Sequence, residues 1–148
     1  MKQFILLDCA GISPGSMYYP AFSCNLLSMA SYIRENTDWE VKVIIPRMDV
    51  GFPLDEQGFK CIEDRVVKVI QQKVGNGEKT VFGFSITCTE NIVYALPLAK
   101  RLKETFDAPI LYGGFGPTVA HRMVCEDYHD IVDAVIVGIG EYLSLIHI

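Results

Sequence analysis

Hydroxyl side chains and paired glycines follow two neighbouring apolar segments that the sequence predicts as strands. Ser85, Thr87 and Thr89 alternate along the chain, so their hydroxyls would lie along one side of it. Gly113 and Gly114 follow the next predicted strand, where paired glycines permit a positive φ or close approach of a bulky group to the backbone. These residues favour binding of a large ligand, although a plain strand-to-helix turn would use the same residue types.

The predicted first strand leads into a long loop that contains glycines, prolines, hydroxyls and aromatics and extends to Pro20. An extended ligand could lie on this loop, and a surface loop without a ligand is the alternative. Asp8 is either a catalytic acid or an acceptor for nearby backbone N–H groups, which is the commoner role at a strand end. No histidine follows this strand, and we expect His121 and His129, in or after the last helix, to be solvated or to cap it.

The five cysteines are widely spaced and form no Cys-x-x-Cys pair. This spacing disfavours a disulfide framework and a zinc or iron–sulfur site within this chain. We expect Cys24, Cys61 and Cys125 to be small core residues. Cys9 and Cys88 differ from them because each follows a predicted strand.

Several well-known motifs are absent from the sequence. The segments 114–119 and 138–143 do not complete G-x-G-x-x-G, and neither follows the first strand. There is no G-x-x-x-x-G-K-[ST] loop, no G-x-S-x-G elbow, and no carboxylate after the third strand paired with a lysine after the fifth. These absences exclude P-loop NTPases, α/β-hydrolases and phosphoryl-accepting receiver domains.

Length and composition indicate one globular domain. The chain has 148 residues, 50% of them hydrophobic, which is enough to bury a core without disulfides or a structural metal. The net charge of −5, with one short basic cluster at the end of a predicted helix, disfavours nucleic-acid binding. Because the apolar run at the N-terminus is short and no run reaches about eighteen residues, we expect a soluble, cytoplasmic protein that does not bind membranes.

The elements that must position these residues alternate between two periodicities. Near-continuous apolar runs predict strands that are buried on both faces, over residues 4–7, 41–45, 80–84, 109–112 and 134–137. Three-to-four spacing predicts helices over residues 26–33, 62–73, 92–106 and 119–128. We expect Thr89 to cap the third helix, Pro97 to kink it or delay its start, and Pro117 to lie in the first turn of the fourth.

This alternation predicts an α/β, flavodoxin-like (Rossmann-like) fold, with a five-stranded parallel sheet of order 2-1-3-4-5 and helices on both faces. Ligands of such sheets bind beyond the carboxyl ends of the strands, where the order reverses between the first and third strands. The loops after the first, third, fourth and fifth strands are therefore the candidate site.

Several segments, in this order, resemble the N-terminal cobalamin-binding domain of cobalamin-dependent radical S-adenosylmethionine enzymes. Residues 25–36 are similar to the "LAS-x-L-R-E-x-G" helix of that family, and 83–85 with 99–103 match further segments. Residues 113–118 resemble "GG-x-H-x-T", and 133–141 resemble "D-x-V-V-x-G-E-G-E". Gly116 and Ile139 depart from the family at positions where it often has His and Glu. The resemblance covers residues 1–142.

The resemblance implies a site for cobalamin. Ser85 and Thr87 would supply hydrogen bonds, Gly113 and Gly114 would clear space for the benzimidazole, and the nucleotide tail would thread between the first and third strands. The strand-end loops would carry the corrin. Because the segment 8–11 contains no imidazole, the resemblance implies a base-off form without a histidine on the cobalt. The implied cofactor-binding residues are Cys9, Gly11, Ser85, Thr87, Thr89, Gly113, Gly114, Phe115, Gly138, Gly140 and Glu141.

The resemblance also implies that radical chemistry belongs to a second, C-terminal domain that this sequence lacks. That domain would hold the four-iron, four-sulfur cluster and S-adenosylmethionine, and its Cys-x-x-x-Cys-x-x-Cys motif is missing here. We expect the parent protein to perform methyl transfer or a related rearrangement, and this fragment to have no catalytic activity alone. Residues 143–148 resemble a translated sequencing adapter and are interpreted as a non-native tail, with a true terminal strand as the alternative.

Two other functions stay open at this stage. A flavodoxin-like module could bind FMN or another phosphate ligand at the first loop, where Ser13, Gly15 and Ser16 could cradle the phosphate. The length of that loop and its two prolines disfavour this alternative. A degenerate domain that binds no cofactor and serves as a scaffold is the other possibility.

Overall fold

The computed structural model describes residues 2–9, 24–49, 56–74 and 79–138. In them, five parallel strands form one sheet in the order β2-β1-β3-β4-β5. The strands are β1 (Lys2–Asp8), β2 (Glu40–Ile44), β3 (Lys79–Ser85), β4 (Ile110–Gly113) and β5 (Ala134–Ile136). The sheet confirms the predicted flavodoxin-like α/β fold, and each strand lies within two residues of its predicted bounds.

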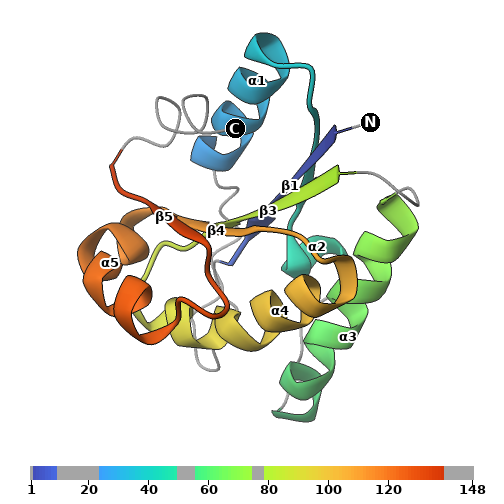
Figure 1. The fold of residues 1–148 in the computed structure, drawn as a ribbon. Coiled ribbons are helices and arrows are strands. Elements are labelled where there is room, and N and C mark those ends of the chain that lie inside the picture. Colours follow the sequence, from blue (N-terminus) through green and yellow to red (C-terminus); the bar gives the residue numbers. More distant parts are fainter. Residues whose placement is uncertain (1, 10–23, 50–55, 75–78, 139–148) are drawn as a thin grey trace.

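Helices cover the sheet unequally (Figure 1). They are α1 (Cys24–Asn36), α2 (Pro46–Asp49), α3 (Glu56–Lys73), α4 (Glu90–Phe106) and α5 (Phe115–Asp127). Figure 1 shows α1 on one side of the sheet and α3 and α4 on the other, with α5 beside β4 and β5. Within the described ranges, no helix is both long enough and apolar enough to cross a membrane.

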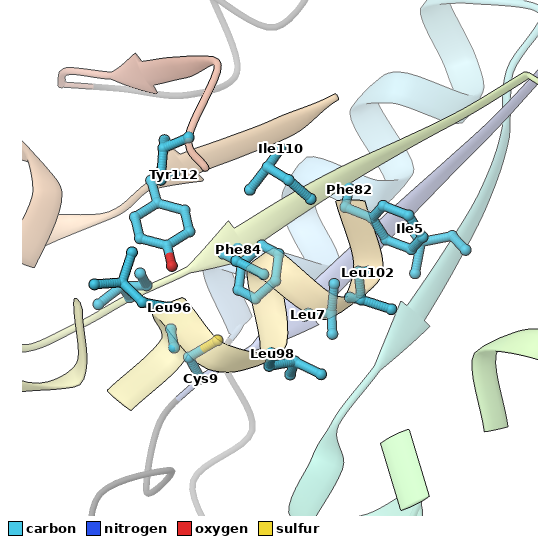
Figure 2. Close-up of a cluster of buried hydrophobic side chains, with 14 of the residues drawn as sticks. Ile5, Leu7, Cys9, Phe82, Phe84, Leu96, Leu98, Leu102, Ile110 and Tyr112 are labelled. Atoms are coloured by element: carbon cyan, nitrogen blue, oxygen red, sulfur yellow. The ribbon is translucent and has the colours of Figure 1, made fainter. Parts of the chain in front are cut away.

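The larger core lies on the side of the sheet that α4 covers, which we call the α4 face (Figure 2). Ile5 and Leu7 of β1 point to this face, as do Phe82 and Phe84 of β3, because alternate residues of a strand point the same way. All four are at most 1% exposed. Burial at this density stabilises the sheet by about 1.5–3 kcal/mol for each large side chain.

The smaller core lies on the opposite side, which we call the α1 face. Phe4 and Leu6 of β1 pack there against Leu26, Ala30 and Ile33 of α1. This core covers the β1 and β2 half of the sheet. The α1 face over the remaining strands is described with the site.

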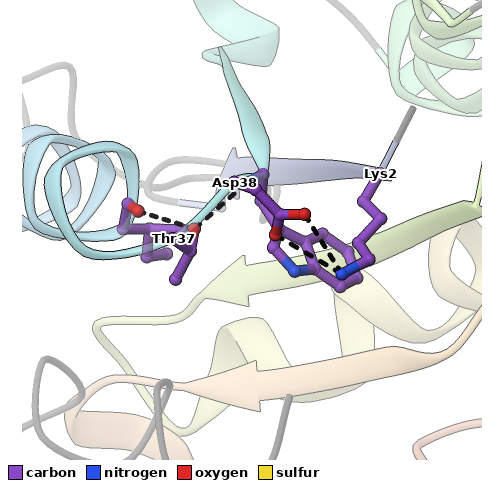
Figure 3. Close-up of polar contacts among 5 residues, drawn as sticks. Lys2, Thr37 and Asp38 are labelled. Atoms are coloured by element: carbon purple, nitrogen blue, oxygen red, sulfur yellow. Dashed lines mark hydrogen bonds and ion pairs between the residues drawn. The ribbon is translucent and has the colours of Figure 1, made fainter.

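Beyond this core, the amino-terminal end of β1 is held at the surface by a polar contact (Figure 3). The Lys2 ammonium lies 3.3 Å from the Asp38 carboxylate and 5.8 Å from the centre of the Trp39 ring. Thr37, just after α1, donates its hydroxyl to the Ile33 carbonyl at 2.7 Å. These contacts link the first two strands at the end of the sheet opposite the candidate site.

Two expectations about α4 are confirmed only in part. Thr89 is the N-cap residue of the helix, as expected, but makes no side-chain capping hydrogen bond, because its backbone is already helical, with φ −59° and ψ −36°. Pro97 does not delay the helix, which begins at Glu90 and continues through the proline. In α5, Pro117 lies near the start of the helix as expected, and the backbone leaves helical geometry at Ala120 instead.

The cysteines are not distributed as expected. Cys24 and Cys125 lie on exposed positions of α1 and α5, so the prediction that they are core residues is wrong. Cys88 is exposed as well, whereas Cys9 is buried. The side chain of Cys61 lies outside the described residues.

Candidate functional site

The carboxyl ends of the strands place four residues in one row across the α1 face. The register pairs Asp8 with Ser85, Ser85 with Gly113, and Gly113 with Ile136. Residues in register on neighbouring parallel strands point to the same face of a sheet. A buried carboxylate, a hydroxyl, a glycine and an aliphatic side chain therefore follow one another along this edge.

The next row inward contains another glycine. Gly83 lies in register with Leu6 on one side and Leu111 on the other. A Cβ added at Gly83 would be 2.7 Å from Phe4 Cε1 and 2.9 Å from Leu6 Cδ2, so those side chains lean over the glycine. Small residues at 83, 85 and 113 thus leave the middle of this face without large side chains.

A cavity of about 540 Å³ occupies this space. Its walls come from β1, α1, β3, β4, β5 and the turns that follow the last three strands. The size is within the range of small-molecule sites, about 300–1,000 Å³. The cavity lies on the α1 face, where residues of β1, β3, β4 and β5 line it. Because β1 and β3 are directly paired from Lys2–Lys79 to Asp8–Ser85, it lies above these strands and does not pass between them.

Most of the predicted site residues that the structure describes line this cavity. They are Ser85, Thr87, Gly113, Gly114, Phe115 and Gly138. Phe115 is 71% exposed, which places its ring at the mouth. Gly11, Gly140 and Glu141 lie outside the described residues, as do Ser13, Gly15 and Ser16 of the alternative phosphate site.

Gly113 and Gly114 are adjacent, but the structure requires a glycine at only one of the two positions. Gly114 has φ +105°, and a Cβ there would be 2.5 Å from the Ile86 carbonyl oxygen, so the turn into α5 requires glycine. Among the described residues, a Cβ at Gly113 would meet only Ile136 Cβ at 3.7 Å, an ordinary contact. The backbone and its packing therefore explain Gly114, whereas neither of them explains Gly113, which borders the cavity.

Hydroxyl groups at the carboxyl-end side of the cavity differ in their bonding. Thr118 Oγ1 donates to the Gly114 carbonyl at 2.7 Å and accepts from the Gly138 N–H at 3.3 Å. The Ser85 and Thr87 hydroxyls make no hydrogen bond within the part of the chain that the structure describes. Thr118 thus ties the two turns together, and the other two hydroxyls are available to a ligand.

Two of the predicted residues do not reach the cavity. Cys9 follows Asp8 by one position and therefore points to the α4 face, where it is 0% exposed in the larger core. Thr89 does not line the cavity either but precedes α4 in an exposed turn. The structure therefore does not bring Cys9 and Thr89 together with the other predicted site residues at this cavity.

The backbone of Cys9 nevertheless connects the end of β1 to Ser85 of β3 and to Asn91 of α4. Its N–H donates to the Ser85 carbonyl at 3.0 Å, and its carbonyl accepts from the buried Asn91 amide at 3.2 Å. Burial, followed by the nearby Asp8 carboxylate, raises the pKa of the thiol well above its usual value. Cys9 is therefore a protonated core thiol rather than a nucleophile.

The opposite side of β4 contains a second buried titratable group. Tyr112 is 0% exposed, and its ring packs on Phe84 with centroids 5.2 Å apart. Its hydroxyl has no hydrogen-bond partner among the residues that the structure describes. Burial, and then the neighbouring Cys9, raises the pKa of this phenol. Figure 2 shows both side chains in the core on the α4 side of the sheet, and neither lines the cavity.

Sequence reasoning missed the apolar walls of the cavity and the threonine that bridges its turns. The missed lining residues include Phe4, Leu6, Leu26, Met29, Leu111, Ile136 and Thr118. The strand residues were already identified as core by their composition, but only the register shows which face each takes. The four-residue spacing from Gly114 to Thr118 was the available signal for the bridge.

No charged side chain lines the cavity among the described residues. Nor do the described residues contain a group of three His, Cys, Asp or Glu side chains that could hold a metal ion. His121 and His129 are exposed, and each ring contacts a backbone carbonyl three residues earlier, at 3.0 and 3.1 Å. The cavity therefore suits an uncharged, largely apolar group that can accept or donate a few hydrogen bonds at one end.

Comparison with known proteins gives no relative from which a function could be transferred. No protein-family model, no curated protein and no solved structure matches this chain.

Proposed function

We propose that this chain binds cobalamin, with the nucleotide tail inserted in the cavity of the α1 face and without a histidine on the cobalt. The chain would act as the cobalamin-binding module of a larger radical S-adenosylmethionine enzyme. In that enzyme, whose second domain would carry the iron–sulfur cluster, bound cobalamin would supply a cobalt centre able to carry a methyl group.

The observation that carries the proposal is the gap at Gly113. Neither the backbone conformation nor the packing at this position requires a glycine, yet a larger side chain would extend into the cavity. Beside it, the half-buried Ser85 and the exposed Thr87 offer hydroxyls that have no hydrogen-bond partner within the described part of the chain. A cradle that a side chain would fill, with free hydrogen-bonding groups at its edge, fits the base and ribose of a nucleotide tail.

The chain's own residues would hold and orient the ligand. Phe4, Leu6 and Leu26 would exclude water from the base, and Ser85 would hydrogen-bond to the tail. The exposed ring of Phe115 would contact the ligand where it leaves the cavity. A base held in this way cannot also coordinate cobalt, so the bound form would be base-off.

The flavin alternative has less support at this site. A flavin phosphate binds where arginine, lysine or converging N–H groups neutralise it. The described lining residues provide no cationic side chain, which disfavours a terminal flavin phosphate in the cavity and requires the phosphodiester of a cobalamin tail to lie outside it. The first-loop residues on which the alternative depends lie outside the described residues. The binding test therefore includes FMN as a second ligand.

The test is a direct binding measurement on the purified chain. Incubation with hydroxocobalamin or with FMN, followed by desalting and absorbance spectroscopy, should leave cobalamin bound with a base-off spectrum. Gly113→Leu should weaken binding by at least about tenfold, because its side chain occupies the cavity. Its thermal unfolding midpoint should stay close to that of the parent, since the position has room.

Gly113→Ala is the matched control, because a methyl group there makes only an ordinary contact and fills little of the cavity. It should bind more tightly than Gly113→Leu. Retention of FMN but not cobalamin would replace the proposal with the flavin alternative. A base-on spectrum, or equal binding by the parent and Gly113→Leu, would show that the tail does not enter the cavity. Retention of neither ligand would favour the scaffold interpretation.

A further inference from the structure

The cavity is polar at one end and apolar at the other. Ser85, Thr87 and Thr118 lie at the carboxyl ends of the strands or beyond them. Leu6 and Leu111 lie one row further in, on either side of Gly83. Every hydroxyl that lines the cavity within the described residues therefore belongs to the mouth side.

The inner walls lack hydrogen-bonding side chains. Phe4, Leu6 and Leu26 are 1–2% exposed, and Met29 and Leu111 complete the wall. The backbone groups of the strands behind them are paired within the sheet. The only amide side chain in the described lining, Asn25, is exposed in the first turn of α1 and therefore lies near the mouth.

We propose that the cavity selects the base of the cobamide tail, favouring 5,6-dimethylbenzimidazole over adenine; this inference rests on the proposed function. The base hangs from the ribose by its five-membered ring, so the six-membered ring enters furthest. In dimethylbenzimidazole that ring carries two methyl groups, which suit the apolar wall. In adenine it carries ring nitrogens and an amine, which would lose their hydrogen bonds to water without replacement.

The size of the effect follows from general hydrogen-bond energetics. A buried polar group without a partner lowers affinity by roughly tenfold or more. The methyl groups of dimethylbenzimidazole add apolar contacts, which raise the affinity for cobalamin. We therefore expect the adenine-tailed cobamide to bind at least about tenfold more weakly than cobalamin.

A substitution at Leu111 is expected to change the preference for dimethylbenzimidazole over adenine. It is half-buried, lines the cavity and lies in register between Gly83 and Ala134. Leu111→Asn would place an amide on the inner wall, where it can pair with adenine and would be left unpaired by dimethylbenzimidazole. Leu111→Met keeps the wall apolar with a similar volume and is the matched control.

The experiment is a calorimetric titration of the purified chain with three probes: cobalamin, the adenine-tailed cobamide, and cobinamide, which has no nucleotide. The parent and Leu111→Met should bind cobalamin most tightly. Leu111→Asn should narrow or reverse the ratio of the two dissociation constants. Cobinamide should bind most weakly, because it places nothing in the cavity.

The outcomes separate the two proposals. Equal affinity for both tailed cobamides, or an unchanged ratio in a folded Leu111→Asn, would overturn base selection while leaving cobalamin binding intact. Binding of cobinamide as tightly as cobalamin, or no binding of any of the three, would overturn insertion of the tail and with it the proposed function.

Discussion

The two faces of the sheet are built from alternate residues of the same strands, yet they are filled differently. On the α4 face, β3 and β4 present Phe82, Phe84 and Tyr112, each at most 1% exposed. On the α1 face the same two strands present Gly83 and Ser85, followed by Gly113. One face is filled with large side chains against α4, and the other has glycine or serine at the positions that border the cavity.

This difference indicates where stability and binding reside. Parallel sheets normally bury both faces, so an unfilled region on one face is costly in lost contacts. The α4 face supplies the compensating burial, in the larger of the two cores. The packed α4 face thus supports the sheet, and the cavity lies on the opposite, α1 face of the same strands.

The largest expected effect comes from the packed face. Phe82→Ala should lower the free energy of unfolding by about 3–5 kcal/mol, because the ring is fully buried and packs on Phe106 at 5.4 Å. Leu111→Ala, on the cavity side, should cost roughly 1 kcal/mol, since part of that side chain already borders open space. Urea denaturation measures both, and equal losses would contradict the contrast between the faces.

The next effect separates the two glycines. Gly114→Ala should destabilise the chain by about 2 kcal/mol or more, because it combines a positive φ with a clash against the Ile86 carbonyl. Gly113→Ala should change stability by less than about 0.5 kcal/mol. Thermal unfolding of the two single variants gives the comparison. A large loss at Gly113 would mean that the fold, and not a ligand, requires that glycine.

A third effect concerns the buried thiol and appears only at high pH. The folded-state pKa of Cys9 is raised, so the unfolded chain loses this proton first, and the free energy of unfolding should fall as pH rises above about 9. One such group contributes a slope of about 1.4 kcal/mol per pH unit. Cys9→Ala should reduce the slope in denaturation curves, whereas Cys88→Ala, at an exposed position, should leave it unchanged.

The smallest effect is expected at the far end of the sheet. Asp38→Asn removes the ion pair with Lys2, whose side chain is 48% exposed, while that of Asp38 is 75% exposed. Such a pair contributes less than about 0.5 kcal/mol, and less at high salt. Urea denaturation at two salt concentrations measures this contribution, and ligand affinity should not change. A larger loss would mean that the smaller core depends on its surface contacts.

The sequence was sufficient for the sheet and for part of the site. Near-continuous apolar runs identified the strands, and the rules for parallel connections identified their order. The hydroxyls at 85 and 87 and the glycines at 113 and 114 were correctly brought to one edge, because carboxyl ends of parallel strands meet there. These inferences depend on local composition and topology alone.

The remaining features depend on which face a residue takes. A strand that is apolar throughout has no alternation, so the sequence could not show that Asp8 points to one face and Cys9 to the other. The contribution of Leu26 depends on how α1 packs, which local periodicity does not specify. The contact between Thr118 and Gly138 joins residues twenty positions apart on different elements.

The hydrogen bond between Thr118 and Gly138 affects how the protein can respond to a bound ligand. β5 is a three-residue edge strand, and the Gly138 N–H after it bonds to a hydroxyl on the first turn of α5, which also holds the Gly114 carbonyl. Outward displacement of the strand end must therefore stretch this bond or carry the beginning of the helix along. Widening of the cavity mouth and tilting of α5 are therefore coupled. Entry of a ligand would move the solvent-exposed surface of this helix.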